Sequence, residues 1–355
     1  MAFKGAHPDD HSRAEMDLLR PEVTFIPDPA GKVDLDNRKI LTVGGDAFEY
    51  DQVILATGAE ASPAMIPGLA EGSVNFHTGP GSAMKVWDSV RSFKRGRIGV
   101  LIAGEPHRCP PSPDAALFLL DEFLTHRGIR DDVELTLLTP HSKPYPADDI
   151  AEVVAPLFEK RKIKTLPTFT VDSVDPRAKK AFSREGDEYS YDLLISIPPH
   201  RGTKVVRESG FGDEEGWIRV DKKRMIVDGH DDAFGVGDAT NVPVYKSGVA
   251  AYLESRVVAA NMAAEVEGKE KERVYDGRIS APLELGHRRA LVVSATYEKP
   301  ASIHAPSLIN YAMKRGFDAI YWSVLSCKWE WMMNVYFGQS TEAVERIASQ
   351  TVPQT

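Results

Sequence analysis

The chain has 355 residues, of which 42% are hydrophobic and 27% are charged, and its formal net charge is −9. This length is enough for two domains, or for one large domain with insertions, and for a sizeable core. The acidic balance and the absence of a concentrated Lys/Arg tract exclude nucleic acid as an expected partner.

Cysteine content and hydropathy restrict the expected compartment. The only two cysteines, Cys109 and Cys327, lie far apart, so neither a disulfide framework nor a zinc cluster is predicted, and a reducing, cytoplasmic location is expected. The polar N-terminus predicts no signal peptide, and no run of about 18 apolar residues could span a bilayer. Any membrane contact is therefore expected to be peripheral.

The N-terminal region is predicted to form a small antiparallel meander that leads into a buried strand. Short β-type runs are separated by Pro, Gly and Asp turn signals, and they cover residues 23–26, 32–36, 39–43 and 48–58. The last run, which ends in Thr57 and Gly58, is the most informative.

The middle of the chain alternates between strand and helix patterns. Strands are predicted at 98–103, 133–139 and 191–197, helices at 114–127 and 149–161, and an extended segment at 164–171. This alternation implies right-handed crossovers and a parallel sheet, so the segment is predicted to be a doubly wound α/β domain. Further along lie Trp217–Val220, a strand at 234–238 and a long helical pattern from Ser247 to about Glu267.

Two strand ends carry the residues expected to contact a ligand. In open α/β sheets ligands lie beyond the carboxyl ends of strands, where a glycine allows close approach. Thr57 and Gly58 end one such strand, although a purely structural role is equally compatible with them. Gly237 and Asp238 end the other, and Asp238 can accept a hydrogen bond from a ribityl or ribose hydroxyl.

In this order, the two strand ends and the doubly wound insert resemble the two-dinucleotide-binding-domain flavoproteins. The resemblance implies an α/β fold with two Rossmann-like domains, the first incomplete at its N-terminus, plus C-terminal amphipathic helices. It implies FAD as cofactor, with Thr57 and Gly58 near the pyrophosphate and Gly237 and Asp238 at the ribityl chain. The implied domains are 1–59 and 196–270 for FAD, 60–195 for a second Rossmann-like (NAD-type) unit, and 271–355 for a membrane- and quinone-associated region.

The turn at 103–113 narrows the resemblance. Where a nicotinamide-using enzyme carries a glycine-rich phosphate loop, this chain has four prolines and a single glycine, Gly104. Because proline has no N–H to donate, NAD(P) binding there is disfavoured. The Cys109-Pro-Pro-Ser-Pro element, together with Lys246 and Gly248, is similar to sulfide:quinone oxidoreductases and flavocytochrome c sulfide dehydrogenases. The resemblance implies Cys109 as the catalytic cysteine and Lys246 and Gly248 as cofactor-binding residues.

Two departures from that family are visible. The family uses a further pair of cysteines beside the flavin, and 279–286, where the later one is expected, contains none. The glycine-rich GxGxxG turn expected before the meander is also missing, so a lowered FAD affinity is expected.

Cys109 also has a plain structural interpretation as a small buried apolar residue. The neighbouring His107 and Arg108 could lower its pKa, and His107 with Cys109 is a weak candidate for a metal pair. No metal site is predicted.

Aromatic residues interleaved with Lys and Arg mark the segment 308–337, which holds three of the five tryptophans of the chain. Such a pattern suits an amphipathic helix pair in a bilayer interface, although packing on the domain or at a dimer interface is the alternative. The resemblance favours the membrane and a quinone partner.

These observations lead to three hypotheses. The first is an FAD-dependent oxidoreductase, peripheral to the cytoplasmic face of a membrane, that passes electrons from a small sulfur reductant to quinone. The second is an enzyme like the type II NADH:quinone oxidoreductases, and the third is a non-catalytic or truncated protein of the flavoprotein fold. The sequence leaves a homo-oligomer open.

Overall fold

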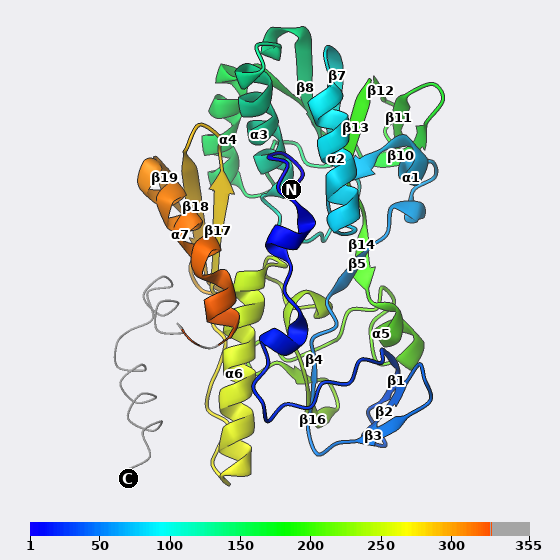
Figure 1. Cartoon of the computed structure of the whole chain (residues 1–355), viewed down its shortest axis with the longest axis vertical. Coiled ribbons are helices and arrows are strands. Elements are labelled where there is room, and N and C mark those ends of the chain that lie inside the picture. The colour runs from blue at the N-terminus through cyan, green and yellow to red at the C-terminus, as the bar shows by residue number, and fades with distance from the viewer. Residues whose placement is uncertain (327, 329–355) are drawn as a thin grey trace.

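The computed structural model describes residues 1–326 and 328. Two halves are stacked along the long axis of the molecule and joined by a narrow ribbon (Figure 1). We call residues 69–197 the upper half, and residues 30–58 with 202–266 the lower half, after their places in Figure 1. The C-terminal antiparallel sheet and the helix that follows it, α7 (Leu308–Leu325), lie at the side of the upper half (Figure 1).

A parallel sheet forms the centre of the upper half. Its strand order is β6-β13-β7-β8-β9, and all neighbours run parallel. The apolar run at 98–102 is buried almost throughout, as expected for a strand covered on both faces. The strands are β6 (Val74–Asn75), β7 (Gly96–Ile102), β8 (Val133–Leu138), β9 (Ile163–Leu166) and β13 (Leu193–Ile197).

Three amphipathic helices pack against this sheet. They are α2 (Pro80–Ser92), α3 (Ser112–His126) and α4 (Asp148–Lys160). Leu117, Leu120 and Leu124 of α3 are fully buried, and each such leucine contributes about 1.5–3 kcal/mol. The predicted strand and helix alternation is thereby confirmed, except that 164–171 is not one continuous extended segment, because β9 ends at Leu166.

A small antiparallel sheet extends the upper half and was not expected from the sequence. Its strands are β10 (Val171–Asp175), β11 (Lys180–Ser183) and β12 (Glu188–Ser190), and it packs against the short helix α1 (Leu69–Gly72). The Tyr191 hydroxyl donates a hydrogen bond of 2.9 Å to the Gly72 carbonyl, which fastens the two together.

The lower half combines a meander with a second, smaller parallel pairing. The predicted meander is present as β1 (Ala30–Asp34), β2 (Lys39–Thr42) and β3 (Ala47–Glu49), and β4 (Val53–Leu55) pairs parallel with β16 (His230–Gly235). The remaining elements are β15 (Ile226–Val227), α5 (Lys204–Ser209) and the long helix α6 (Gly248–Val266). The predicted strand at 23–26 is wrong, because these residues form no ladder and are largely exposed.

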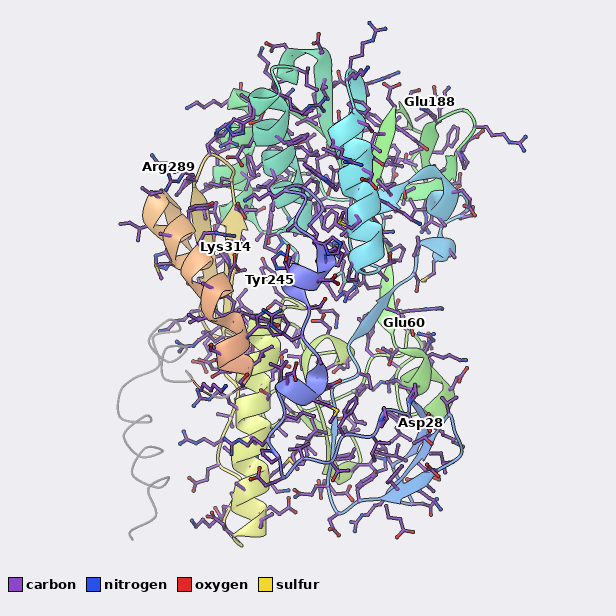
Figure 2. All side chains as sticks on the ribbon, viewed as in Figure 1. Asp28, Glu60, Glu188, Tyr245, Arg289 and Lys314 are labelled. Carbon is purple, nitrogen blue, oxygen red and sulfur yellow. The ribbon has the colours of Figure 1, made fainter. Side chains whose placement is uncertain are left out.

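The ribbon between the halves consists of β5 (Ala59–Ala61) and β14 (His200–Gly202), which pair antiparallel. Glu60, labelled between the halves in Figure 2, accepts hydrogen bonds from the Lys204 backbone N–H at 2.9 Å and from the Arg207 guanidinium at 3.1 Å. The ribbon is therefore tied to the start of α5.

The C-terminal sheet packs one face on the upper half. Its strands β17 (Ile279–Glu284), β18 (Ala290–Ala295) and β19 (Ser302–Ser307) are followed by α7 (Leu308–Leu325). Leu283, Leu291 and Val293 join the core of the upper half. The first predicted C-terminal helix is thus present, whereas 327 and 329–337 lie outside the described residues. Short 3₁₀ turns occupy Pro8–His11, Glu15–Asp17, Pro63–Met65, Arg130–Asp132 and Gly237–Ala239.

None of the described helices is long and apolar enough to cross a bilayer.

The domain boundaries predicted from the sequence, 1–59, 60–195, 196–270 and 271–355, stay predictions.

Candidate functional site

A cleft of about 500 Å³ lies where the two halves meet. The upper half contributes His77, Arg108 and Cys109, among others, from the segments before α2 and α3. The lower half contributes the turn after β16 and the start of α6. The complete lining is Met1, Phe76, His77, Gly79, Pro80, Ala83, Arg108, Cys109, Ser112, Asp238, Lys246, Ser247 and Gly248. Four of the residues predicted from sequence, Cys109, Asp238, Lys246 and Gly248, therefore lie in one cleft.

Cys109 is held in the turn between β7 and α3 by backbone hydrogen bonds at both ends. Its N–H donates to the Lys246 carbonyl at 2.8 Å, and its carbonyl accepts from the Ser112 N–H at 2.8 Å. Its φ is +55°, a left-handed value that is uncommon for a residue with a side chain. Such strained backbone persists where neighbouring contacts fix it, and it clusters at functional sites.

The Cys109 thiol is exposed to the cleft, and the predicted buried apolar role is not what the structure shows. Protein atoms nevertheless crowd the cleft, so that desolvation, with a smaller contribution from Asp238, raises the pKa of the Cys109 thiol to about 11. Lys314 of α7 acts in the opposite direction. At neutral pH the Cys109 side chain is therefore a thiol rather than the more nucleophilic thiolate.

Lys246 lines the cleft and belongs to the lower half. Its ammonium donates to the backbone carbonyls of Asp238 at 3.0 Å and Thr240 at 2.7 Å, and it lies 3.9 Å from the centre of the Trp217 ring. Burial lowers the pKa of Lys246 to about 8, while Asp238 and Glu254 oppose that shift. Lys246 therefore holds the Asp238 turn in shape and brings a positive charge to the cleft.

Glu254 supports the same turn from α6. Its side chain is 1% exposed, and its Oε2 accepts a hydrogen bond of 2.6 Å from the Gly237 N–H. Burial raises the pKa of Glu254 to about 7, against the lowering effect of that hydrogen bond and of Lys246. A small hollow lined by Gly237, Lys246, Ser247 and Glu254, among others, lies beside it. Sequence reasoning missed Glu254, since a single Glu in a helical pattern carries no signal of burial.

The raised pKa of Glu254 leads to a stability prediction. The folded protein retains this proton up to about pH 7, whereas the unfolded chain releases it near 4.5. The stability of the wild type should therefore fall as pH rises through this window, by up to about 3 kcal/mol. Glu254→Gln should lack this loss and be more stable than the wild type at pH 8 in urea unfolding. Glu152→Gln, at an exposed position of α4, is the control. Parallel curves for wild type and Glu254→Gln would contradict the prediction.

Three histidines cluster beside the cleft, and one of them, His77, lines it. The ring centres of His77 and His200 are 5.2 Å apart, and that of His107 is 6.2 Å from His77. Burial lowers the pKa of His77 to about 2 and that of His200 to about 4, so both rings are neutral at neutral pH. Among the described residues, no group of three or more His, Cys, Asp or Glu side chains is placed to hold a metal ion.

The proton of His200 can be located. Its Nδ1 lies 2.8 Å from the Pro198 carbonyl, which can only accept, so Nδ1 carries the hydrogen. Its Nε2 is then an acceptor, and it is buried without a hydrogen-bond partner.

Thr57 and Gly58 lie apart from the cleft lining, at the carboxyl end of β4. The Val236 N–H donates to the Leu55 carbonyl at 3.1 Å, which keeps this end beside the Gly237 turn. The Thr57 hydroxyl oxygen is buried without a partner, and a Cβ at Gly58, where φ is +71°, would meet no atom within 4 Å. An orphaned buried hydroxyl next to open space fits the expected binding of a polar ligand here.

The packing of the turn after β7 agrees with the prediction that NAD(P) binding is disfavoured there. A Cβ at Gly104 would lie 2.7 Å from the Pro199 backbone, so this glycine serves close packing of the chain. At the start of α3, the Ser112 and Ala115 N–H groups donate to the Cys109 and Pro111 carbonyls, and Pro113 has no N–H. These three positions at the start of α3 therefore offer no N–H group to a pyrophosphate.

No protein-family profile matches the chain. A mitochondrial sulfide:quinone oxidoreductase of Mus musculus is 22% identical over 330 residues, which cover 88% of this chain and 73% of that protein. The crystal structure of the sulfide:quinone oxidoreductase from Aquifex aeolicus superposes with a TM-score of 0.74 at 18% identity, covering 86% of this chain and 76% of that one.

The chain is a relative of the sulfide:quinone oxidoreductases. The predicted resemblance is thereby confirmed, and the fold is that of the two-dinucleotide-binding-domain flavoprotein oxidoreductases. A chain in the mitochondrial ATP synthase of Tetrahymena thermophila also has this fold, with a TM-score of 0.67 at 20% identity over 88% of this chain and 79% of that one. The same sulfide:quinone oxidoreductase-like fold thus also occurs in a large assembly.

Proposed function

We propose that this sulfide:quinone oxidoreductase-like chain binds FAD and passes two electrons from a small sulfur reductant to a quinone. The observation that carries the proposal is the convergence of Cys109 from one half with Asp238, Lys246 and Gly248 from the other on one cleft. For hydrogen sulfide as donor, the overall reaction gives zero-valent sulfur and quinol, so two electrons and two protons move from the sulfide to the quinone.

The residues at the two strand ends suit a flavin dinucleotide. Gly58, with its orphaned neighbour Thr57, would receive the pyrophosphate side, while Gly237 and Asp238 would receive the ribityl chain. Gly248 begins α6 and leaves open space, so its helix N-terminus can face a ring oxygen. A bound flavin would supply the acceptor for the two electrons.

Side chains of this protein would then bind the sulfur donor and stabilise its charge. The chain has no second cysteine near Cys109 in its described part, so Cys109 is the single thiol available to meet the donor. Lys246 and Arg108 bring positive charge to the cleft and would favour an anionic sulfur there. The unpaired Nε2 of neutral His200, which lies beside His77, can accept a hydrogen bond.

We further propose that α7 brings the protein to the surface of a membrane, on its cytoplasmic face, where quinone is dissolved. Ile309, Met313 and Tyr321 are 71%, 45% and 38% exposed on this helix. Apolar side chains on an exposed helix beside Lys314 and Arg315 suit a position in the headgroup region.

The first experiment is anaerobic reduction of the FAD-reconstituted protein. Sulfide should bleach the visible absorbance of the flavin. NADH should leave it unchanged, because Ser112, Pro113 and Ala115 at the start of α3 offer no N–H group to a pyrophosphate. Rapid reduction by NADH alone would overturn the proposal in favour of a type II NADH:quinone oxidoreductase-like enzyme.

A second candidate function is a non-catalytic subunit of a larger assembly. The observation that favours it is the chain of the same fold in the Tetrahymena thermophila ATP synthase. This function predicts that the purified protein shows no flavin absorbance after FAD is added and desalted away. Stoichiometric retention of FAD would exclude it.

A further inference from the structure

A second cavity, of about 510 Å³, lies away from the cleft, between the C-terminal sheet and α7. None of its lining residues belongs to the cleft described above. The lining is Arg278, Ile279, Ser280, Val292, Ser294, Ala295, Thr296, Lys299, Pro300, Ser302, His304, Asn310 and Met313. The proposed electron transfer assigns no role to these lining residues.

A row of three serines forms one wall. Ser280 is the cross-strand partner of Ser294, which is in turn the partner of Ser302, so the three lie side by side on three neighbouring strands. Directly paired residues point to the same face of a sheet, and all three line the cavity. In the part of the chain that the structure describes, none of these hydroxyls makes a hydrogen bond. The wall thus offers three hydroxyl donors to a ligand.

Basic side chains surround this row. Arg278, Lys299 and His304 line the cavity, and none of the described lining residues is acidic. Asp276, which is not part of the lining, lies 3.2 Å from the Arg278 guanidinium and offsets part of its charge. In a chain with a net charge of −9, hydroxyls and cations gathered around one cavity favour an anion that accepts several hydrogen bonds, such as a phosphate.

The remaining wall is apolar, which a free phosphate would not require. Val292 and Met313 line the cavity, and Met313 is 45% exposed. On the first turn of α7, Leu308 and Ile309 are 50% and 71% exposed. A ligand with a phosphate and acyl chains can satisfy the polar and the apolar surfaces together.

We propose that this cavity binds the phosphate-bearing headgroup of an anionic phospholipid, with the acyl chains against the exposed apolar side chains of α7. The inference deepens the proposed membrane contact of α7 and rests on it. It fixes which face of the C-terminal sheet meets the membrane, and it makes the contact depend on lipid charge.

The test compares binding of the full chain to phosphatidylcholine vesicles with and without phosphatidylglycerol, by co-sedimentation. Lys299→Glu should weaken binding to the anionic vesicles by at least ~5-fold, since one lysine near such a surface accounts for about this factor. Lys94→Glu, an equal change of charge at an exposed residue beyond α2, should leave binding unchanged. Ser294→Phe, which fills the cavity without a change of charge, should weaken binding as Lys299→Glu does.

Three outcomes would overturn the inference. Equal binding to both vesicle types would show that binding does not depend on lipid charge. Equal weakening by the Lys299 and Lys94 variants would show that the cavity is not the binding site. Stabilisation of the wild type by inorganic phosphate alone, lost in Lys299→Glu while vesicle binding persists, would assign the cavity to a soluble phosphate. Vesicle binding is measured without a reductant, so its failure is distinguishable from failure of flavin reduction by sulfide.

Discussion

Replacing Cys109 by serine should reduce sulfide-dependent quinone reduction by more than ~100-fold, the low end of the effect of losing a nucleophile. Serine is nearly the same size, and the backbone of residue 109 is fixed by hydrogen bonds to Lys246 and Ser112, so the thermal midpoint and the FAD content should stay close to those of the wild type. The measurement is steady-state reduction of a soluble quinone with sulfide, with flavin absorbance recorded on the same samples.

The chain itself provides a matched control for this variant. Cys327 is the only other cysteine, and Cys327→Ser should retain full activity. If Cys109→Ser keeps wild-type activity, or if both variants lose it equally, the assignment of Cys109 as the reacting thiol is wrong.

Gly248→Leu should abolish most FAD binding without unfolding the protein. In the ligand-free protein a Cβ at this position meets no atom within 4 Å, so the new side chain enters the cleft without a clash. It would occupy the volume that the flavin ring needs, and the affinity for FAD should fall by at least ~10-fold, or 1.4 kcal/mol and more. Titration of FAD by fluorescence quenching measures the loss, and thermal unfolding without FAD checks the fold.

Gly316→Leu makes the same change where it should not matter for the flavin. Gly316 lies within α7, and a Cβ there also meets no atom within 4 Å. This variant should bind FAD like the wild type. Equal affinities of all three proteins would mean that the flavin does not lie beside Gly248.

Much of the upper half could be predicted because its strands are long apolar runs and its helices have a clear period. The strand at 23–26 was predicted from β-branched and aromatic residues, yet Val23, Phe25 and Ile26 are 50%, 38% and 40% exposed. Local propensity does not produce a strand without a partner strand. The hairpins between Val171 and Ser190 were missed, because strands of three to five residues with mixed polarity give too short a pattern.

The candidate site could be predicted in part for a topological reason. Strand ends of parallel sheets mark ligand positions, so Gly237 and Asp238 could be predicted to lie near a ligand, and the resemblance brought in Cys109. Nothing in the sequence could place His77 or Glu254 there, since each reaches the site from a different element and carries no motif. Their positions depend on how the halves pack, which local patterns do not encode.

The hydrogen bond from the Cys109 N–H to the Lys246 carbonyl has a consequence for the modularity of the protein. The Cys109 thiol belongs to one half, and the backbone carbonyl that fixes its turn belongs to the other. Neither half carries the site by itself, so exchanging either half for that of a distant relative would leave the thiol without its anchor unless the Lys246 loop were transplanted with it. The candidate site is thus a property of the interface between the halves, and a change in how they pack would alter it even if every lining residue were kept.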